Sequence, residues 1–168
     1  MSQPTSQNAF AYDYPLLIKQ LFLAPVIEQP DQEIVYRDKY RFTYRQFQDR
    51  VRRLASSLKS LGIKPGDTVA VMEWDSHRYL ESYYAVPMIG AVLHTINVRL
   101  SLEQLIYTID HAEDDVILVN AEFLPLLEQI KGRIDNVKQF ILINDSETTP
   151  ACSIPFVDEY EHLLANSE

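Results

Sequence analysis

From residue 43 onward the chain alternates between two kinds of segment, and this alternation limits the folds open to it. One kind carries apolar residues every three or four positions, as amphipathic helices do. The other is a short, continuously apolar run, as in TVAVM (68–72), VILV (116–119) and QFILI (139–143). Strands that are apolar on both faces are typical of parallel sheets covered by helices on both sides. The sequence therefore predicts an α/β domain with a doubly wound, mostly parallel sheet.

Two of the predicted helices begin with the same capping signature. Thr43 with Gln46 and Ser101 with Gln104 each form a capping box. The first of these helices ends before Gly62 and presents a basic stripe, for which a solvated surface is favoured over a phosphate site. That stripe contains Arg45, Arg50, Arg52, Arg53 and Lys59. Further helices are expected over 77–86, over 122–131 and after Asp158, the last one following a polar loop at 144–153.

The N-terminal part of the chain divides into a tail and the beginning of the domain. Residues 1–13 are polar and patternless, which predicts a mobile tail, and residues 14–168 are expected to form one α/β unit. A first helix, ending at Pro25 or Pro30, presents an apolar face that packs either on its own domain or on a partner subunit. That face holds Leu17, Ile18, Leu21 and Phe22. The segments 33–37 and 41–43 then predict a small hairpin.

The stretch VPMIGAVLHTINVRLS, residues 86–101, is the most informative one for function. It is expected to break a helix at Pro87, to turn at Gly90 and to run apolar over 91–93 as a buried strand around which the rest of the chain packs. Polar residues follow, at the carboxyl end of that strand. They are His94, Thr95, Asn97 and Arg99. Ligands of open α/β sheets bind outside such strand ends, which makes these four residues the candidate site.

Each of these polar residues also has a structural interpretation. His94 and Thr95 either line a pocket or satisfy hydrogen bonds locally at the strand end. Asn97 and Arg99 either contact an anionic ligand, helped by the helix that starts after Ser101, or serve the loop and the cap. The residues alone leave both interpretations open.

Composition narrows the remaining choices. The net charge of −9 opposes non-specific nucleic-acid binding. Cys152 is the only cysteine, no Cys and His cluster has metal-ligand spacing, and no signal peptide or membrane span is recognisable, so a cytoplasmic protein is expected. All four glycines sit where a turn or a cap needs one, and neither a Walker loop nor a dinucleotide fingerprint is present. A self-sufficient nucleotide-binding domain is therefore not expected.

Four collinear segments resemble the N-terminal part of the AMP-forming acyl-CoA synthetases, members of the adenylate-forming superfamily. They are FTYRQF (42–47), LKSLGIKPGDTVAVM (58–72), AVPMIGAVLHTINVRLS (85–101) and IDHAEDDVILVN (109–120). The likeness extends over about residues 14–165, and GAVLHTINVRLS is most similar to the medium- and long-chain fatty acyl-CoA synthetases. The resemblance implies the first subdomain of the adenylate-forming ligase fold.

The resemblance also implies a reaction. In that family a fatty acid and Mg-ATP give an acyl-adenylate and pyrophosphate, and CoA then displaces AMP. The family's phosphate loop, magnesium-binding segments and catalytic lysine all lie downstream of the matching region, so we expect an N-terminal fragment that does not catalyse adenylation alone and holds no metal. The alternatives are a truncated interaction or dimerisation module and a related ligase for aryl or short-chain acids.

Few of the family's site residues are expected within this chain. The resemblance places His94, Thr95, Asn97 and Arg99 at the periphery of the acyl and CoA channel. It also makes Leu17 and Phe22 candidates for a homodimer contact, because relatives of this type can dimerise through their N-terminal regions.

Overall fold

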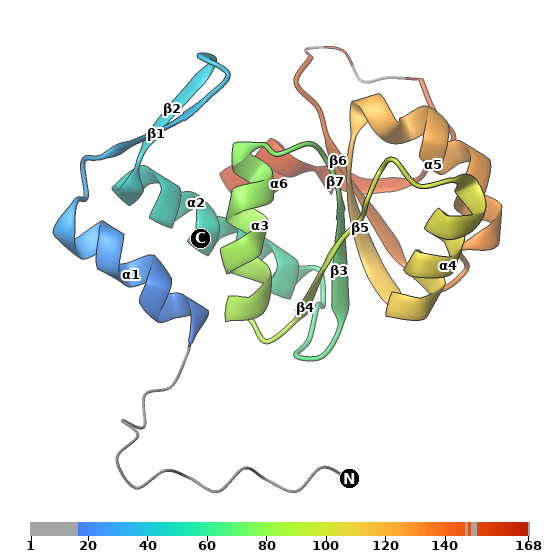
Figure 1. The fold of residues 1–168 in the computed structure, drawn as a ribbon, viewed down its shortest axis with the longest axis horizontal. Coiled ribbons are helices and arrows are strands. Elements are labelled where there is room, and N and C mark those ends of the chain that lie inside the picture. The colour runs from blue at the N-terminus through green and yellow to red at the C-terminus, as the bar shows by residue number, and fades with distance from the viewer. Residues whose placement is uncertain (1–16, 147, 149–150, 168) are drawn as a thin grey trace, which may run out of the picture.

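The computed structural model describes residues 17–146, 148 and 151–167. The expected mobile tail at 1–13 lies outside these residues. A five-stranded sheet, flanked by helices, forms the body of the molecule, and a two-stranded hairpin stands apart from it (Figure 1). The helices are α1 (Ile18–Glu28), α2 (Tyr44–Ser60), α3 (His77–Met88), α4 (Leu102–Ala112), α5 (Leu124–Ile130) and α6 (Tyr160–Ala165). The strands are β1 (Glu33–Tyr36), β2 (Tyr40–Thr43), β3 (Thr68–Met72), β4 (Val92–Thr95), β5 (Asp114–Asn120), β6 (Gln139–Ile143) and β7 (Phe156–Glu159).

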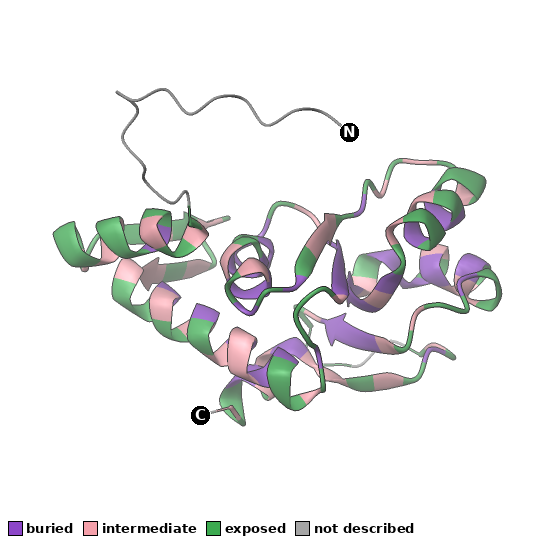
Figure 2. Ribbon diagram, turned by 90° about the horizontal axis from the view of Figure 1, so that it is seen from below, coloured by how far each residue is buried: buried purple, intermediate pink, exposed green. Residues whose placement is uncertain are grey.

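The large sheet is parallel throughout, in the order β4-β3-β5-β6-β7. Successive side chains of a strand point to opposite faces, so the apolar runs feed two cores. Val69 and Val71 face α2, α3 and α6, whereas Ala70 and Met72 face α4 and α5. The buried strands and the helices on both sides are visible in Figure 2. The predicted doubly wound α/β architecture is confirmed.

The helix starts follow the sequence closely. Both capping boxes are formed, with the Thr43 hydroxyl accepting from the Gln46 N–H at 3.2 Å and the Ser101 hydroxyl accepting from the Gln104 N–H at 3.4 Å. Gly90 makes the expected turn at φ +83°, where a side chain would be strained and a Cβ would lie 3.1 Å from Pro65. The capping boxes are readable from the sequence because both partners lie three positions apart.

The position of the strand at 91–93 was predicted wrongly. The strand β4 lies at an edge of the sheet, with Val92 52% exposed and Thr95 exposed, and the fully buried strand is β3. The molecule is thus organised around β3 and its neighbour β5, which pair directly with each other. The sequence of a short strand does not determine which strands pair with it. The edge strand β4 was therefore predicted to be a central strand.

Three smaller expectations also need correction. Pro87 does not break α3 but lies in its last turn, one residue before the helix ends at Met88, and Pro25 lies inside α1, which ends at Glu28. The strand β7 was missed, because its burial is mixed and it falls between the expected loop and the last helix.

The hairpin and α1 form an outlying part of the molecule. The hairpin is antiparallel, with Glu33 opposite Thr43 and Tyr36 opposite Tyr40, as predicted. No helix among the described residues combines the length and the apolar character that crossing a bilayer requires.

Candidate functional site

The order of the strands creates a switch point between β3 and β5. The chain leaves β3 for β4 on one side and then returns to β5 on the other. Ligands of open α/β sheets bind outside the carboxyl ends of the strands at such a point. The loops that follow β3, β4 and β5 therefore define the candidate site. The polar and aromatic residues at these strand ends and in these loops include Glu73, Trp74, Thr95, Asn97, Arg99, Asn120 and Glu122.

Arg99 lies in this region as an exposed cation on an aromatic support. Its guanidinium carbon is 5.8 Å from the centre of the Trp74 ring, close enough for a cation–π interaction. Within the part of the chain that the structure describes, no carboxylate lies within 4.0 Å of Arg99. Asn97 shapes the loop, since its side-chain oxygen accepts the Arg99 backbone N–H at 3.1 Å. Arg99 is therefore a cation at this edge that can pair with an anionic group.

Trp74 is itself fixed by the loop after β5. Its indole N–H donates to the Glu122 carboxylate at 2.8 Å, and its ring packs 5.0 Å from the ring of Phe123. The three loops at the switch point are thus connected through one indole ring. Sequence analysis did not single out Trp74, although its place directly after an apolar strand was a usable signal.

Glu73 is a buried carboxylate at the same edge and was also missed. It is 5% exposed, and its Oε1 accepts from the Trp74 N–H at 3.0 Å and from the Asn120 amide at 2.8 Å. Its Oε2 has no hydrogen-bond partner among the described residues. Burial raises the pKa of Glu73, and the hydrogen bonds from Trp74 and Asn120 and the charge of Arg78 only partly oppose that rise.

His94 is directed away from this cluster. Its Nδ1 lies 2.8 Å from the carboxylate of Asp114, which is fully buried at the amino end of β5. The imidazole must reach across β3, where its register neighbour is Ala70, a residue small enough to leave room. Burial raises the pKa of Asp114, and the hydrogen bond and charge of His94 partly offset it. The structure thus gives His94 a buried partner that lies 20 positions further along the chain and not at its own strand end.

Thr95 ends β4 and lies near α3. It is exposed, and its side chain interacts with the phenol of Tyr79. Burial, with a smaller effect of Tyr83, raises the pKa of Tyr79 to about 12. Thr95, Asn97 and Arg99 therefore share the carboxyl edge of the sheet, whereas His94 is directed toward Asp114 at the amino end of β5.

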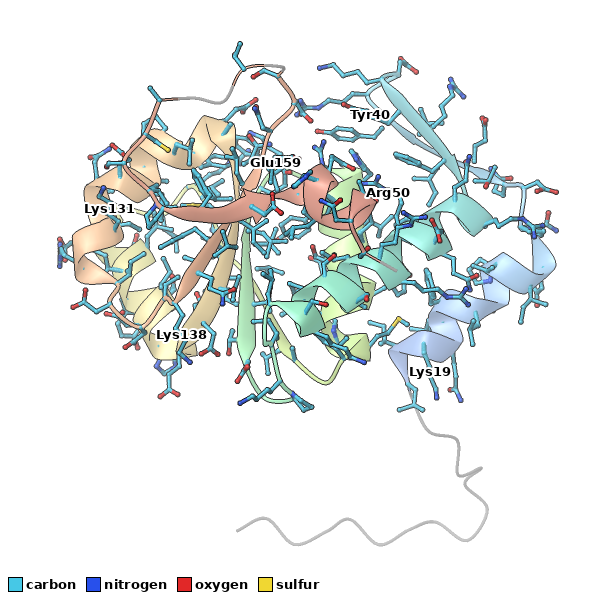
Figure 3. The ribbon with its side chains drawn as sticks, turned by 180° about the vertical axis from the view of Figure 1, so that it is seen from behind. Lys19, Tyr40, Arg50, Lys131, Lys138 and Glu159 are labelled. Carbon is cyan, nitrogen blue, oxygen red and sulfur yellow. The ribbon has the colours of Figure 1, made fainter. Side chains whose placement is uncertain are left out.

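The basic stripe of α2 is not a uniformly solvated face. Arg50 is only 18% exposed and bridges two carboxylates, at 2.6 Å to Glu81 and 2.8 Å to Glu161. Arg78, which is 2% exposed, holds Glu161 at 2.8 Å and Asp145 at 2.7 Å. These ion pairs join α2, α3 and α6 beneath the hairpin, and Figure 3 shows Arg50 with Tyr40 above it. The prediction of a solvated role was wrong for Arg50, because its partners come from distant segments.

The N-terminal helix uses one of its candidate contact residues internally. Phe22 is 2% exposed and packs 5.7 Å from the ring of Phe47 and 4.8 Å from that of Tyr84. Leu17 is 45% exposed and Leu21 is 72% exposed. In this structure Phe22 is therefore part of the chain's own core and is not available to a partner, while the outer face of α1 is.

No metal centre is apparent in the described part of the chain. No group of three or more His, Cys, Asp or Glu side chains there is arranged to hold an ion. Three of the four glycines, Gly62, Gly66 and Gly90, have positive φ angles and serve turns or caps. The described residues therefore offer no glycine-rich cradle for a triphosphate.

Comparison with known proteins decides the family. The family model described as AMP-binding enzyme matches residues 24–162, most of the chain. The chain belongs to the AMP-binding enzyme family. Among curated members, it is 39% identical over 128 residues to a medium-chain-fatty-acid–CoA ligase of Ectopseudomonas oleovorans, covering 76% of this chain and 23% of that protein. It is 43% identical over 106 residues to a long-chain-fatty-acid–CoA ligase of Thermus thermophilus, covering 63% of this chain and 20% of the relative.

Several solved structures share the fold of this chain. An anthranilate CoA ligase bound to anthranoyl-AMP superposes with a TM-score of 0.79 at 21% identity, covering 92% of this chain and 29% of that one. A fatty acyl CoA synthetase of Mycobacterium tuberculosis gives 0.74 at 20% identity, with 88% and 28% covered. The chain thus spans about a fifth to a quarter of the length of the curated relatives it matches.

Proposed function

We propose that this chain forms the first part of an AMP-forming fatty acid–CoA ligase. The observation that carries the proposal is the 39% and 43% identity to medium- and long-chain-fatty-acid ligases. In the proposed reaction a fatty acid and ATP give an acyl-adenylate and pyrophosphate, and the thiol of CoA then displaces AMP. The chemical reason for two steps is that a free carboxylate has no good leaving group until it is adenylated.

ATP and Mg²⁺ do not fit the residues described here. The glycines serve turns and caps, and the described acidic residues form no metal-binding group. We therefore assign the triphosphate and its magnesium to segments outside this chain, and we expect the 168-residue chain to be inactive in adenylation. We also propose a cytoplasmic location, because a chain with a single cysteine cannot form an internal disulfide and fits a reducing compartment.

CoA is the ligand that we assign to the described residues. Thr95, Asn97 and Arg99 are assigned to the periphery of the CoA and acyl channel, and the support is the unpaired Arg99 guanidinium at the switch point. An arginine presents a planar fork of donors to phosphate oxygens, and CoA carries phosphates. His94 keeps only an indirect role in this proposal, holding the edge strand β4 through Asp114.

The proposal is tested by fatty-acid-dependent ATP–pyrophosphate exchange. We expect no exchange above background with the 168-residue chain, and exchange when the chain is continued by the codons that follow Glu168 in the gene. An active 168-residue chain would contradict the assignment of the triphosphate site. A continuation that lacks a Ser/Thr/Gly-rich loop would contradict the ligase assignment itself.

Two alternatives keep specific support. A ligase for aryl or short-chain acids remains an alternative, since the chain is also 37% identical over 154 residues to an acetate/butyrate–CoA ligase of Arabidopsis thaliana. A substrate profile of the continued enzyme separates it from a fatty acid ligase. A homodimer contact through α1 is supported by the exposure of Leu17 and Leu21, although Phe22 is buried in its own chain. Sedimentation of the chain at several concentrations decides between monomer and dimer.

A further inference from the structure

Two hydrogen-bonded routes connect Trp74, which follows β3, to Glu122, which follows β5. The first is direct, because the Trp74 indole N–H donates to the Glu122 carboxylate at 2.8 Å. The second begins at the buried Glu73, whose Oε1 accepts from the Trp74 backbone N–H at 3.0 Å and from the Asn120 amide at 2.8 Å. The Asn120 side-chain oxygen in turn accepts the Glu122 backbone N–H at 2.9 Å. One route holds the side chain and the other holds the backbone, so the position and the orientation of the indole are both fixed.

Packing also immobilises the Trp74 ring. The ring is half-buried, lies 5.0 Å from the ring of Phe123 and packs against the core between the sheet and the helices α4 and α5. None of these contacts involves Arg99. The indole is therefore a rigid platform whose place in the fold does not depend on the arginine that lies over it.

Arg99 reaches this platform from the loop after β4. Its backbone is shaped by Asn97, whose side-chain oxygen accepts the Arg99 N–H at 3.1 Å and whose carbonyl accepts the Leu100 N–H at 3.2 Å. Its side chain is exposed and makes no hydrogen bond among the described residues, so the Trp74 ring, 5.8 Å from the guanidinium carbon, is what restrains it. A long side chain loses rotamer freedom when a ligand immobilises it, and a contact that restrains it beforehand lowers that cost.

The indole contacts two opposite charges that do not pair with each other. Its N–H donates to the carboxylate of Glu122, and the guanidinium of Arg99 lies over its ring. Within the described part of the chain, no ion pair of 4.0 Å or less joins Arg99 to Glu122 or to any other carboxylate. The carboxylate is thus engaged by the indole, and the donors of Arg99 stay free for another anion.

We propose that Trp74 is a positioning residue, which holds the Arg99 guanidinium at the switch point so that Arg99 contacts a phosphate of CoA. The contact with CoA rests on the proposed ligase function. Trp74 acts through Arg99, and Glu122 acts through Trp74. The contacts that hold the indole and the arginine all lie within the described chain, so the positioning itself does not depend on which segments or ligands cover the crevice.

The positioning is tested in the 168-residue chain without any ligand. Trp74 is the only tryptophan, so the fluorescence of the chain reports on this ring alone. Arg99→Ala uncovers the ring and should make the quenching of its emission by acrylamide faster. Arg52→Ala removes an exposed arginine from α2 and serves as the control, which should quench as the natural chain does. Equal quenching of Arg99→Ala and the natural chain would show that the guanidinium does not lie on the ring, and would overturn the proposal.

The contact with CoA is tested by steady-state kinetics of the chain continued by the codons that follow Glu168. Arg99→Ala should raise the KM for CoA about tenfold or more, because a charge-assisted contact is lost. Trp74→Leu should raise it about threefold with kcat nearly unchanged, and Trp74→Phe, which keeps an aromatic ring, should lie between Trp74→Leu and the natural enzyme. The double variant should have the same KM as Arg99→Ala, because Trp74 has nothing to position once the guanidinium is gone. Tyr107→Leu, at a 66% exposed position on α4, is the aromatic control and should change neither constant.

Three kinetic results would contradict the proposal. Effects that multiply in the double variant would mean that Trp74 does not act through Arg99. An unchanged KM for CoA in Arg99→Ala would mean that the guanidinium pairs with another group, such as a carboxylate outside the described residues. A rise in the KM values for ATP and the fatty acid together with that for CoA in Trp74→Leu would indicate a general structural defect. A natural continued chain without activity would instead refute the ligase assignment and the CoA contact with it, while the quenching experiment would still decide whether Trp74 holds Arg99.

Discussion

At the scale of single residues, the main surprise is the burial of charged groups at the end of β3 and along α3. Glu73, Arg78 and Glu81 are each at most 5% exposed, and each lies in a segment whose sequence looks like an ordinary strand end or helix. Buried charges need partners, and the partners here come from β5, α2 and α6. Glu73 is the least well satisfied of the three, since its Oε2 lacks a partner among the described residues.

The Glu73→Gln variant tests this interpretation. Because the folded-state pKa of Glu73 is raised, the folded protein holds this proton more tightly than the unfolded chain, and stability falls as pH rises through that pKa. At pH 7 the variant should therefore be more stable than the natural chain, by on the order of 1 kcal/mol. Below the ordinary pKa of a glutamate the gain should disappear, because Glu73 is then protonated in both states.

Urea unfolding at pH 7 and at pH 4 measures the effect. Glu28→Gln removes an exposed carboxylate from α1 and should change stability little at either pH. A loss of stability in Glu73→Gln at pH 7 would show that the charged form of Glu73 is favoured by the fold.

At the scale of elements, caps and helices were predictable and strand neighbours were not. Both capping boxes join residues three positions apart, so the sequence states them directly. The edge positions of β4 and β7 depend on pairings between distant segments. The docking of α1 is an intermediate case: its apolar residues were recognised, but only the structure shows that Phe22 packs inward while Leu21 stays outside.

Substitutions in α1 separate its inner and outer faces. Phe22→Ala removes the ring that packs against Phe47 and Tyr84 and should cost about 3 kcal/mol of α1 docking. Hydrogen exchange of the α1 amides should then become faster, while the amides of β3 and β5 stay protected. Leu21→Ala, at a 72% exposed position, is the control and should change the exchange little. Equal effects of the two substitutions would contradict the observed orientation of the helix.

At the scale of the whole molecule, a network of ion pairs holds the helical layer under the hairpin. Glu161 of α6 contacts Arg50 of α2 and Arg78 of α3, and Glu81 connects Arg50 to the Tyr160 hydroxyl at 2.7 Å. Burial disfavours the charge of Glu161, but hydrogen bonds from His77, Arg50 and Arg78 outweigh burial and lower its pKa. The last helix is thereby connected to segments about a hundred residues earlier in the chain.

Acid titration tests this network. A lowered folded-state pKa contributes stability that is present above the ordinary glutamate pKa and is lost as pH falls toward the folded-state value. Glu161→Gln should cost about 2 kcal/mol at pH 7, less than the loss of a fully buried pair, because the Glu161 side chain is 37% exposed. The difference from the natural chain should shrink toward pH 3, as followed by urea unfolding.

An exposed ion pair provides the control for this titration. Glu103 pairs with Arg133 on the surface, and Glu103→Gln should change stability only slightly at any pH. If Glu103→Gln and Glu161→Gln had equal effects, the position of Glu161 within the network would be irrelevant to its contribution.

The sequence by itself determined the alternation of helices and strands, the caps, the hairpin and the family resemblance. Each of these depends on residues that are neighbours along the chain or on the order of short segments, and both are written in the sequence. Only the tertiary structure decided that β4 is an edge, that His94 turns toward Asp114, that Arg50 pairs with Glu81 and Glu161, and that Glu73 is buried. These features depend on contacts between residues 20 to 111 positions apart, and the partners that lie at such separations are fixed by the packing of the whole domain.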